Sequence, residues 1–148
     1  MIRFVIALMS AVIALPASAE DVIRVAAKGQ VAEVMDRLET KVKGAGATVF
    51  ARVDHAAGAA SVDMQMAPSQ LLIFGNPKLG TPAMQADPLA GLYLPLKVLV
   101  YEDASGSVWL AYQVPSETFD DLAVPKDAGF LANMSGALNK LTMAAASE

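Results

Sequence analysis

His55 is the single histidine of the sequence, and its surroundings limit the chemistry open to it. It follows an alternating stretch, residues 48–54, so it lies where a strand ends and a bend begins, and a side chain there can point into a cleft. A Ser-His-Asp arrangement would need Asp54 to orient the ring, but consecutive strand residues point to opposite faces. The sequence also has no Gly-x-Ser-x-Gly nucleophile turn. A structural histidine, a ligand contact and a general acid or base are the three interpretations left.

Met64 and Met66 form a second candidate set together with His55. One residue separates the two methionines, so their thioethers point to the same side of an extended segment. Soft sulfur ligands suit Cu(I). Methionine also fills irregular gaps in cores, and that is the alternative interpretation. A zinc site is not indicated, because there is one His, no Cys and no His-Glu-x-x-His spacing.

Residues 75–95 contain four prolines and three glycines, which predicts a loop with at most one or two helical turns. Its start has the two-glycine spacing of a phosphate-binding loop, but no lysine lies between Gly80 and Thr81, so a nucleotide site is not indicated. Thr81 is the predicted N-cap of a short helix, with Pro82 at the first helical position. Free backbone N–H groups at that helix start, with Lys78 nearby, predict a site for a small anion or carboxylate. A purely structural turn is the alternative.

The elements that position these residues follow from hydrophobic periodicity. Apolar residues at helical spacing predict one helix from Val31 to Gly44 and another over Phe130 to Leu141. A stretch of small residues from Ala56 to Ser61 predicts a short helix. Runs of β-branched and alternating apolar residues predict strands at 21–27, 48–54, 69–74, 96–102 and 107–114, the last two joined as a hairpin. The resulting order, β-α-β-(short α)-β-loop-β-β-α, is typical of an α+β fold.

Composition excludes several classes of protein. Of the 148 residues, 55% are hydrophobic, which excludes a disordered chain. The net charge of -4 has the wrong sign for a protein that binds nucleic acid through its phosphates, or that lies on an anionic membrane surface. The absence of cysteine excludes disulfides, thiol catalysis, thiolate metal sites and covalent c-type haem attachment.

Residues 1–19 have the pattern of a secretory signal peptide. Arg3 precedes an apolar run, residues 4–15, and Ala17-Ser18-Ala19 provides a cleavage site after Ala19. The run is shorter than the roughly 20 residues that cross a bilayer, so we expect no stable membrane anchor after cleavage. We therefore expect a periplasmic or secreted protein with a single domain, residues 20–148.

The sequence from Val53 to Pro115 carries several short motifs in a fixed order. They are Asp54-His55-Ala56-Ala57-Gly58-Ala59, Leu71-Leu72-Ile73-Phe74-Gly75-Asn76-Pro77-Lys78, Gly80-Thr81-Pro82, Met84-Gln85, Leu94-Pro95-Leu96-Lys97 and the hairpin that ends at Tyr112. In this order they resemble the domain-of-unknown-function family 302. The resemblance implies a curved antiparallel sheet of about five strands with two main helices on one face, a TATA-binding-protein-like fold, but no established reaction. Many members carry Cys where Gly75 stands here, so a thiol role could not operate in this chain.

We predict from these features a non-catalytic binding module for a small molecule or an anion, with a pocket between the sheet and the 75–95 segment. The candidate contacts are His55, Asn76, Lys78, Thr81, Gln85 and Lys97. The alternatives are an exported Cu(I)-handling protein that uses His55, Met64 and Met66, and a hydrolase or isomerase with His55 as base. The sequence identifies no cofactor. A homodimer is a further expectation, because a small sheet with a hairpin can expose an edge that pairing would cover.

Overall fold

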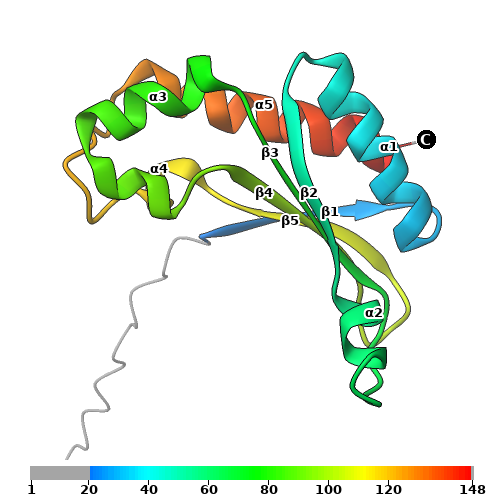
Figure 1. Cartoon of the computed structure of the whole chain (residues 1–148). Coiled ribbons are helices and arrows are strands. Elements are labelled where there is room, and N and C mark those ends of the chain that lie inside the picture. The colour runs from blue at the N-terminus through cyan, green and yellow to red at the C-terminus, as the bar shows by residue number, and fades with distance from the viewer. Residues whose placement is uncertain (1–20, 148) are drawn as a thin grey trace, which may run out of the picture.

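The computed structural model of the chain describes residues 21–147, so the predicted signal peptide lies outside the described residues. The strands form one antiparallel sheet in the order β1-β5-β4-β3-β2 (Figure 1). Their bounds are β1 Val22–Ala27, β2 Thr48–Asp54, β3 Ser69–Gly75, β4 Leu96–Glu102 and β5 Val108–Gln113. The predicted α+β class, with five antiparallel strands, is confirmed.

Two long helices, α1 (Val31–Gly44) and α5 (Gly129–Ala146), cover one face of the sheet (Figure 1). The spacing that predicted α1 corresponds to its buried side, because its five apolar positions all lie in the core. They are Val31, Val34, Met35, Leu38 and Val42. Opposite them the sheet contributes Leu72, Val98 and Leu110, which have no exposed surface. This core fixes which face of each strand is covered and which is left open.

The segment between β3 and β4 differs from the predicted loop. It forms the helix α3 (Pro77–Ala86) and the 3₁₀ helix η1 (Pro88–Leu92). Asn76 starts α3, because its side-chain oxygen accepts a hydrogen bond from the Lys78 N–H at 3.0 Å and Pro77 occupies the first helical position. The predicted N-cap at Thr81 is therefore wrong: Thr81 lies inside a helix that Pro82 does not end.

A second hydrophobic cluster joins α3 and η1 to the short helix α4 (Pro115–Thr118) and to the first turns of α5. Its fully or nearly fully buried members include Ala83, Ala90, Phe119 and Met134. We call α3, η1 and α4 together the lobe. The lobe lies at the end of the sheet where β4 begins and β5 ends (Figure 1).

At the opposite end of the sheet, α2 (His55–Ala60) and the residues that follow it project beyond the strands (Figure 1). We call residues 55–67 the arm. Asp54 caps α2 by accepting a hydrogen bond from the Ala57 N–H at 2.8 Å. No residue of α2 is buried, so the arm is held to the domain mainly at its base.

The position of the β4–β5 hairpin bears on the expected homodimer. The hairpin lies inside the sheet, because β4 pairs with β3 and β5 pairs with β1. The two edge strands are β1 and β2. The edges that pairing could cover are therefore those of β1 and β2, not those of the hairpin, and the homodimer stays a prediction. Among residues 21–147, no helix has both the length and the apolar run that a membrane crossing requires.

Candidate functional site

The face of the sheet that points away from α1 and α5 carries the candidate site. Strand registers align one residue from each strand across this face, in the order Arg24, Ala111, Leu99, Leu71 and Val53. On the central strands, Leu99 and Ala111 each lie between two residues that are buried in the helix-covered core, and Leu71 precedes the buried Leu72. We call this surface the open face. Figure 1 shows that it is bordered by the lobe at one end and by the arm at the other.

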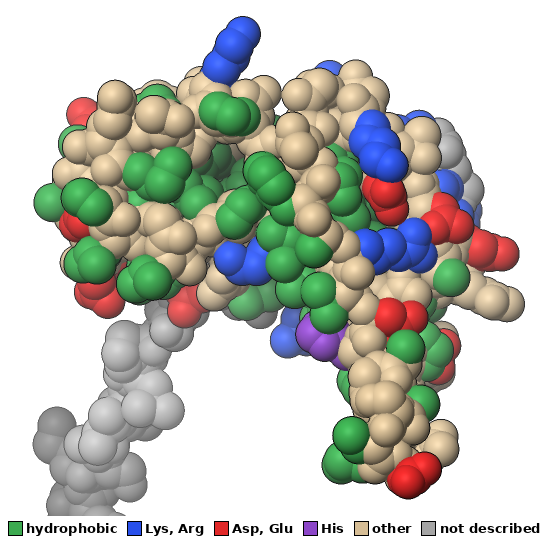
Figure 2. Space-filling model, in the orientation of Figure 1, with side chains coloured by type: hydrophobic (Ala, Val, Ile, Leu, Met, Phe, Trp, Pro, Cys, Tyr) green, Lys and Arg blue, Asp and Glu red, His purple; other side chains and the backbone are tan. Residues whose placement is uncertain are grey.

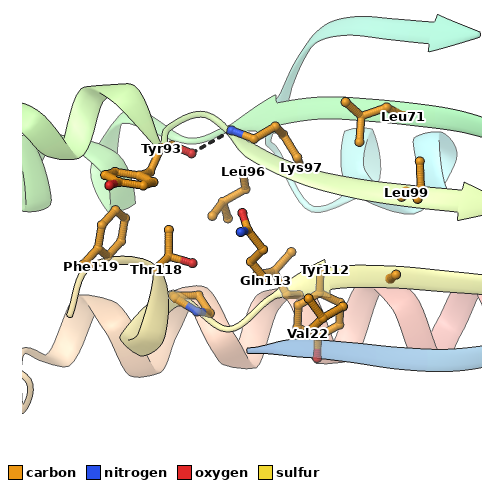
Figure 3. A pocket seen from close by; sticks show the side chains of 13 residues that line it. Val22, Leu71, Tyr93, Leu96, Lys97, Leu99, Tyr112, Gln113, Thr118 and Phe119 are labelled. Atoms are coloured by element: carbon orange, nitrogen blue, oxygen red, sulfur yellow. Dashed lines mark hydrogen bonds between the residues drawn. The ribbon is translucent and has the colours of Figure 1, made fainter. Parts of the chain in front are cut away.

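A cavity of about 250 Å³, here called the sheet pocket, lies where the open face meets the lobe (Figure 3). Leu71, Leu99 and Ala111 line it from the sheet. Tyr93, which follows η1, and Phe119, which follows α4, line it from the lobe, and their rings meet edge to face with centroids 6.0 Å apart. The pocket is therefore mostly apolar, with walls from three elements that are far apart in sequence.

Lys97 supplies the positive charge of the sheet pocket. Its ammonium donates a hydrogen bond to the backbone oxygen of Tyr93 at 2.8 Å (Figure 3) and another to the backbone oxygen of Pro95 at 3.2 Å. Within residues 21–147 no carboxylate lies close enough to form an ion pair with it. Burial lowers the pKa of this amine below its ordinary value, since desolvation disfavours the charged form. A lysine has three N–H donors, so one is left for a ligand.

Two further polar side chains lie at the same pocket. Figure 3 shows Gln113 and Thr118 lying at the space between α4 and β4. The Thr118 hydroxyl donates to the Val114 oxygen at 2.9 Å, which leaves its own oxygen as an acceptor. The Gln113 amide offers both donors and an acceptor. Lys97, Gln113 and Thr118 together can orient one polar group at the edge of an apolar cavity.

A second cavity, of about 220 Å³, lies between α3, the ends of β2 and β3, and α5, and we call it the lobe pocket. Asn76 and Thr81 line it, but most of its wall is apolar, as with Phe50 and Leu94. The N–H groups at the start of α3 are already used: Lys78 donates to the Asn76 side chain, and the next two residues donate to the Asn76 backbone oxygen. The anion site predicted from free N–H groups is therefore wrong, because the cap itself fills them.

The six residues predicted as ligand contacts do not meet in one cavity. Lys97 lines the sheet pocket, while Asn76 and Thr81 line the lobe pocket. Lys78, Gln85 and His55 line neither. His55, the purple side chain in Figure 2, lies at the base of the arm.

The three proposed Cu(I) ligands all lie in the arm. Met64 and Met66 are 64% and 48% exposed, so neither side chain fills the core. In the described part of the chain, no group of three or more His, Asp or Glu residues could hold a metal ion. That observation does not bear on thioether ligands, and the copper site stays a hypothesis.

Tyr93, Gln113, Thr118 and Phe119 are the pocket residues that sequence reasoning missed. Gln113 had a usable signal, because it is the polar residue at the end of an otherwise apolar strand. Thr118 and Phe119 had a weaker one: Pro115 can begin a helical turn, but α4 has only four residues and no periodicity to detect.

A family model described as Domain of unknown function DUF302 matches residues 23–147 of the chain, a longer range than the motifs at 53–115. A crystal structure of an uncharacterized conserved DUF302 protein from Bacillus stearothermophilus superposes with a TM-score of 0.78 at 20% identity. The superposition covers 86% of this chain and 99% of that one. This likeness shows the fold.

Two curated relatives are called Fluoride-specific ion channel FluC 1, one from Brucella suis biovar 1 (strain 1330) and one from Brucella abortus biovar 1 (strain 9-941). Each is 44% identical to this chain over 94 residues, which is 64% of this chain. The matched part is only 37% of the first relative and 35% of the second.

Proposed function

Because the chain belongs to the DUF302 family, a domain of unknown function, we propose a function from the sheet pocket itself: the domain binds a small amphipathic molecule with an anionic group. In this proposal the anionic group contacts the ammonium of Lys97, and the amide N–H groups of Gln113 orient it. The apolar part of the ligand lies against Leu71 and Leu99. No reaction is part of the proposal.

The observation that carries the proposal is an ammonium group in an apolar cavity without a carboxylate partner in the described part of the chain. Two backbone oxygens solvate Lys97 only in part, at 2.8 and 3.2 Å. Lys97 is half-buried, and even partial desolvation of a charge is unfavourable unless the charge is paired. A carboxylate or a similar anion supplies the missing partner and forms a charge-assisted hydrogen bond. The leucines and aromatic rings around it favour a ligand that also has an apolar part.

The names of the Brucella relatives add fluoride to the anions worth testing. The chain spans little more than a third of the length of those proteins, so their activity does not transfer with the match. The walls of the sheet pocket argue against fluoride as its ligand, because a small ion cannot use apolar contacts and loses its water. An organic anion uses both parts of the pocket.

The proposal includes a location outside the cytoplasm, which the signal-peptide pattern of residues 1–19 supports. The ligand would then be a molecule of the periplasm or the surrounding medium. The class of ligand that we test follows from the charge of the pocket and does not depend on the location of the protein.

Calorimetric titration of the protein with octanoate, 1-octanol and fluoride tests the proposal. Octanoate and 1-octanol share the eight-carbon chain and differ in charge. We expect octanoate to bind at least about tenfold more tightly than 1-octanol, which corresponds to about 1.4 kcal/mol for one charge-assisted hydrogen bond. We expect no heat with fluoride. Equal binding of octanoate and 1-octanol, or no binding of octanoate, would overturn the proposal.

A further inference from the structure

The open face is more apolar than a sheet face in contact with water needs to be. Sheets with one solvated face usually alternate apolar and polar residues, whereas near-continuous apolar strands are typical of sheets covered on both faces. Here β3, β4 and β5 read Ser-Gln-Leu-Leu-Ile-Phe-Gly, Leu-Lys-Val-Leu-Val-Tyr-Glu and Val-Trp-Leu-Ala-Tyr-Gln. Their helix-facing positions are buried in the core, yet Leu71 and Leu99 on the other face are apolar as well. The sequence of the central strands is that of a covered sheet.

The arm presents an apolar surface of its own. Val62, Met64 and Met66 are 63%, 64% and 48% exposed. They occupy alternate positions in the second half of the arm sequence. Figure 2 shows a hollow between the arm and the lobe, and the open face forms its roof in the orientation of Figure 1. An exposed apolar projection and a half-buried apolar hollow are therefore present on the same side of one molecule.

We propose that a second copy of this chain covers the open face, with the arm of each copy lying over the sheet pocket of the other. The interface is isologous, because each copy contributes an arm and a hollow to it. The partner's Met64 would then close the mouth of the sheet pocket. This last step rests on the proposed function, whereas the pairing of the two copies does not.

The positions of the arm and the lobe select the symmetry of the dimer. When two open faces meet about a twofold axis that lies across the strands, the second copy runs in the opposite strand direction. Its arm then reaches the lobe end of the first copy, where the sheet pocket lies. An axis along the strands would instead bring the two arms together at one end. Only the first arrangement fills both hollows.

Charge complementarity also favours a second copy of the chain as the partner that covers the open face. On the open face the charged strand residues are Arg24 and Lys97, and both are basic. The acidic residue of the arm is Asp63, which lies between the exposed Val62 and Met64. The acidic, apolar arm is thus complementary to the basic, apolar open face. Electrostatic attraction therefore favours a dimer in which each arm lies on the open face of the other copy, and disfavours one in which the two basic faces meet without the arms.

Sedimentation velocity of the protein and of two matched variants tests the dimer. Met64→Lys places a positive charge against the basic open face at the proposed interface, and Met143→Lys places one at a methionine of α5 that is 55% exposed and lies on the helix-covered side. We expect the protein and Met143→Lys to sediment as dimers. We expect Met64→Lys to raise the dimer dissociation constant by at least about tenfold, because the charge would lose water on association and would repel the basic residues of the facing sheet.

Three results separate the dimer from the ligand proposal. A monomer at every concentration overturns the dimer, and octanoate binding to that monomer would leave the proposed function standing. A dimer that Met64→Lys does not weaken overturns the placement of the arm. A dimer that Met64→Lys dissociates, but that never binds octanoate, supports the interface and overturns the proposed function.

Discussion

Replacement of Lys97 by methionine isolates the contribution of its charge. Methionine keeps most of the aliphatic stem that lines the sheet pocket and removes the ammonium. In our proposal the variant loses one charge-assisted hydrogen bond to the ligand, worth about 1.5–3 kcal/mol. At about 1.4 kcal/mol for each factor of ten, octanoate binding weakens by about 10- to 150-fold.

The effect of Lys97→Met on folding should be much smaller. The side chain donates to two backbone oxygens, at 2.8 and 3.2 Å, and the first of these bonds is exposed, so water can replace the donor. Removal of a partly desolvated charge offsets part of the lost bonding. We expect the free energy of unfolding to change by less than about 1 kcal/mol. Urea denaturation measures this change, and calorimetry measures the binding.

Lys78→Met is the matched control, because it makes the same change of charge at a lysine that lines neither cavity. Lys97→Arg keeps a positive charge and should retain binding. The pKa of Lys97 lies below its ordinary value, so octanoate affinity should fall as pH rises through that lowered pKa, and Lys97→Arg should remove this fall. A folded Lys97→Met that binds octanoate as well as the unchanged protein, or an equal loss in Lys78→Met, would refute the reasoning.

Four further predictions concern other parts of the molecule. Hydrogen bonds from nearby serines and from the tryptophan lower the pKa of Asp103 from 3.8 to about 2, so its stabilising effect is complete above the unfolded value and is lost as pH falls from 3.8 towards 2. Thermal melts by tryptophan fluorescence should show this loss, and Asp103→Asn should abolish it. Asn76→Ala removes the cap of α3 and should cost about 0.5–2 kcal/mol in urea denaturation, and an unchanged midpoint contradicts this role. His55→Ala should leave octanoate binding within about threefold of the unchanged protein, because His55 lines neither cavity, and a larger loss in calorimetry contradicts that placement. If the thioethers bind Cu(I), native mass spectrometry should show a copper adduct that the double variant Met64→Leu, Met66→Leu loses, and an adduct that persists contradicts the hypothesis.

Local periodicity was sufficient to predict the class and order of the fold. The apolar residues of α1 repeat at helical spacing over 14 residues, so their burial follows from the pattern alone. The hairpin could also be predicted from its own sequence. The strands at 96–102 and 108–113 flank a turn in which Asp103 accepts hydrogen bonds from Ser105 and Ser107. In each case the information lies within one short segment.

The segment between β3 and β4 could not be predicted in the same way. Its prolines and glycines are those of a loop, but Pro77 occupies the first helical position and Pro88 begins η1, where a missing N–H costs little. Only Pro82 lies inside a helix. The second hydrophobic cluster supplies the remaining stability, because Ala83 and Ala90 pack there beneath Phe119 and Met134. That contact joins segments that are 29 or more residues apart in the sequence.

The candidate site depends on sheet register, which the sequence leaves open. Lys97 and Gln113 come together because β4 and β5 pair so that Leu99 lies opposite Ala111. A shift of one residue would send one of them to the helix-covered face. The lobe then adds Tyr93 and Phe119, which directly follow two short helices that had little or no sequence signal. Resemblance of motifs pointed to Lys97, but not to the residues that surround it.

The most direct test of the proposed binding site is an NMR titration of isotope-labelled protein with octanoate, in which amide and side-chain signals are assigned to residues. We expect the largest changes at Lys97, Gln113 and Thr118, with none of comparable size at Asn76 or Thr81. That result would place the anionic group in the sheet pocket. Changes confined to the lobe pocket, or to the arm, would contradict the account.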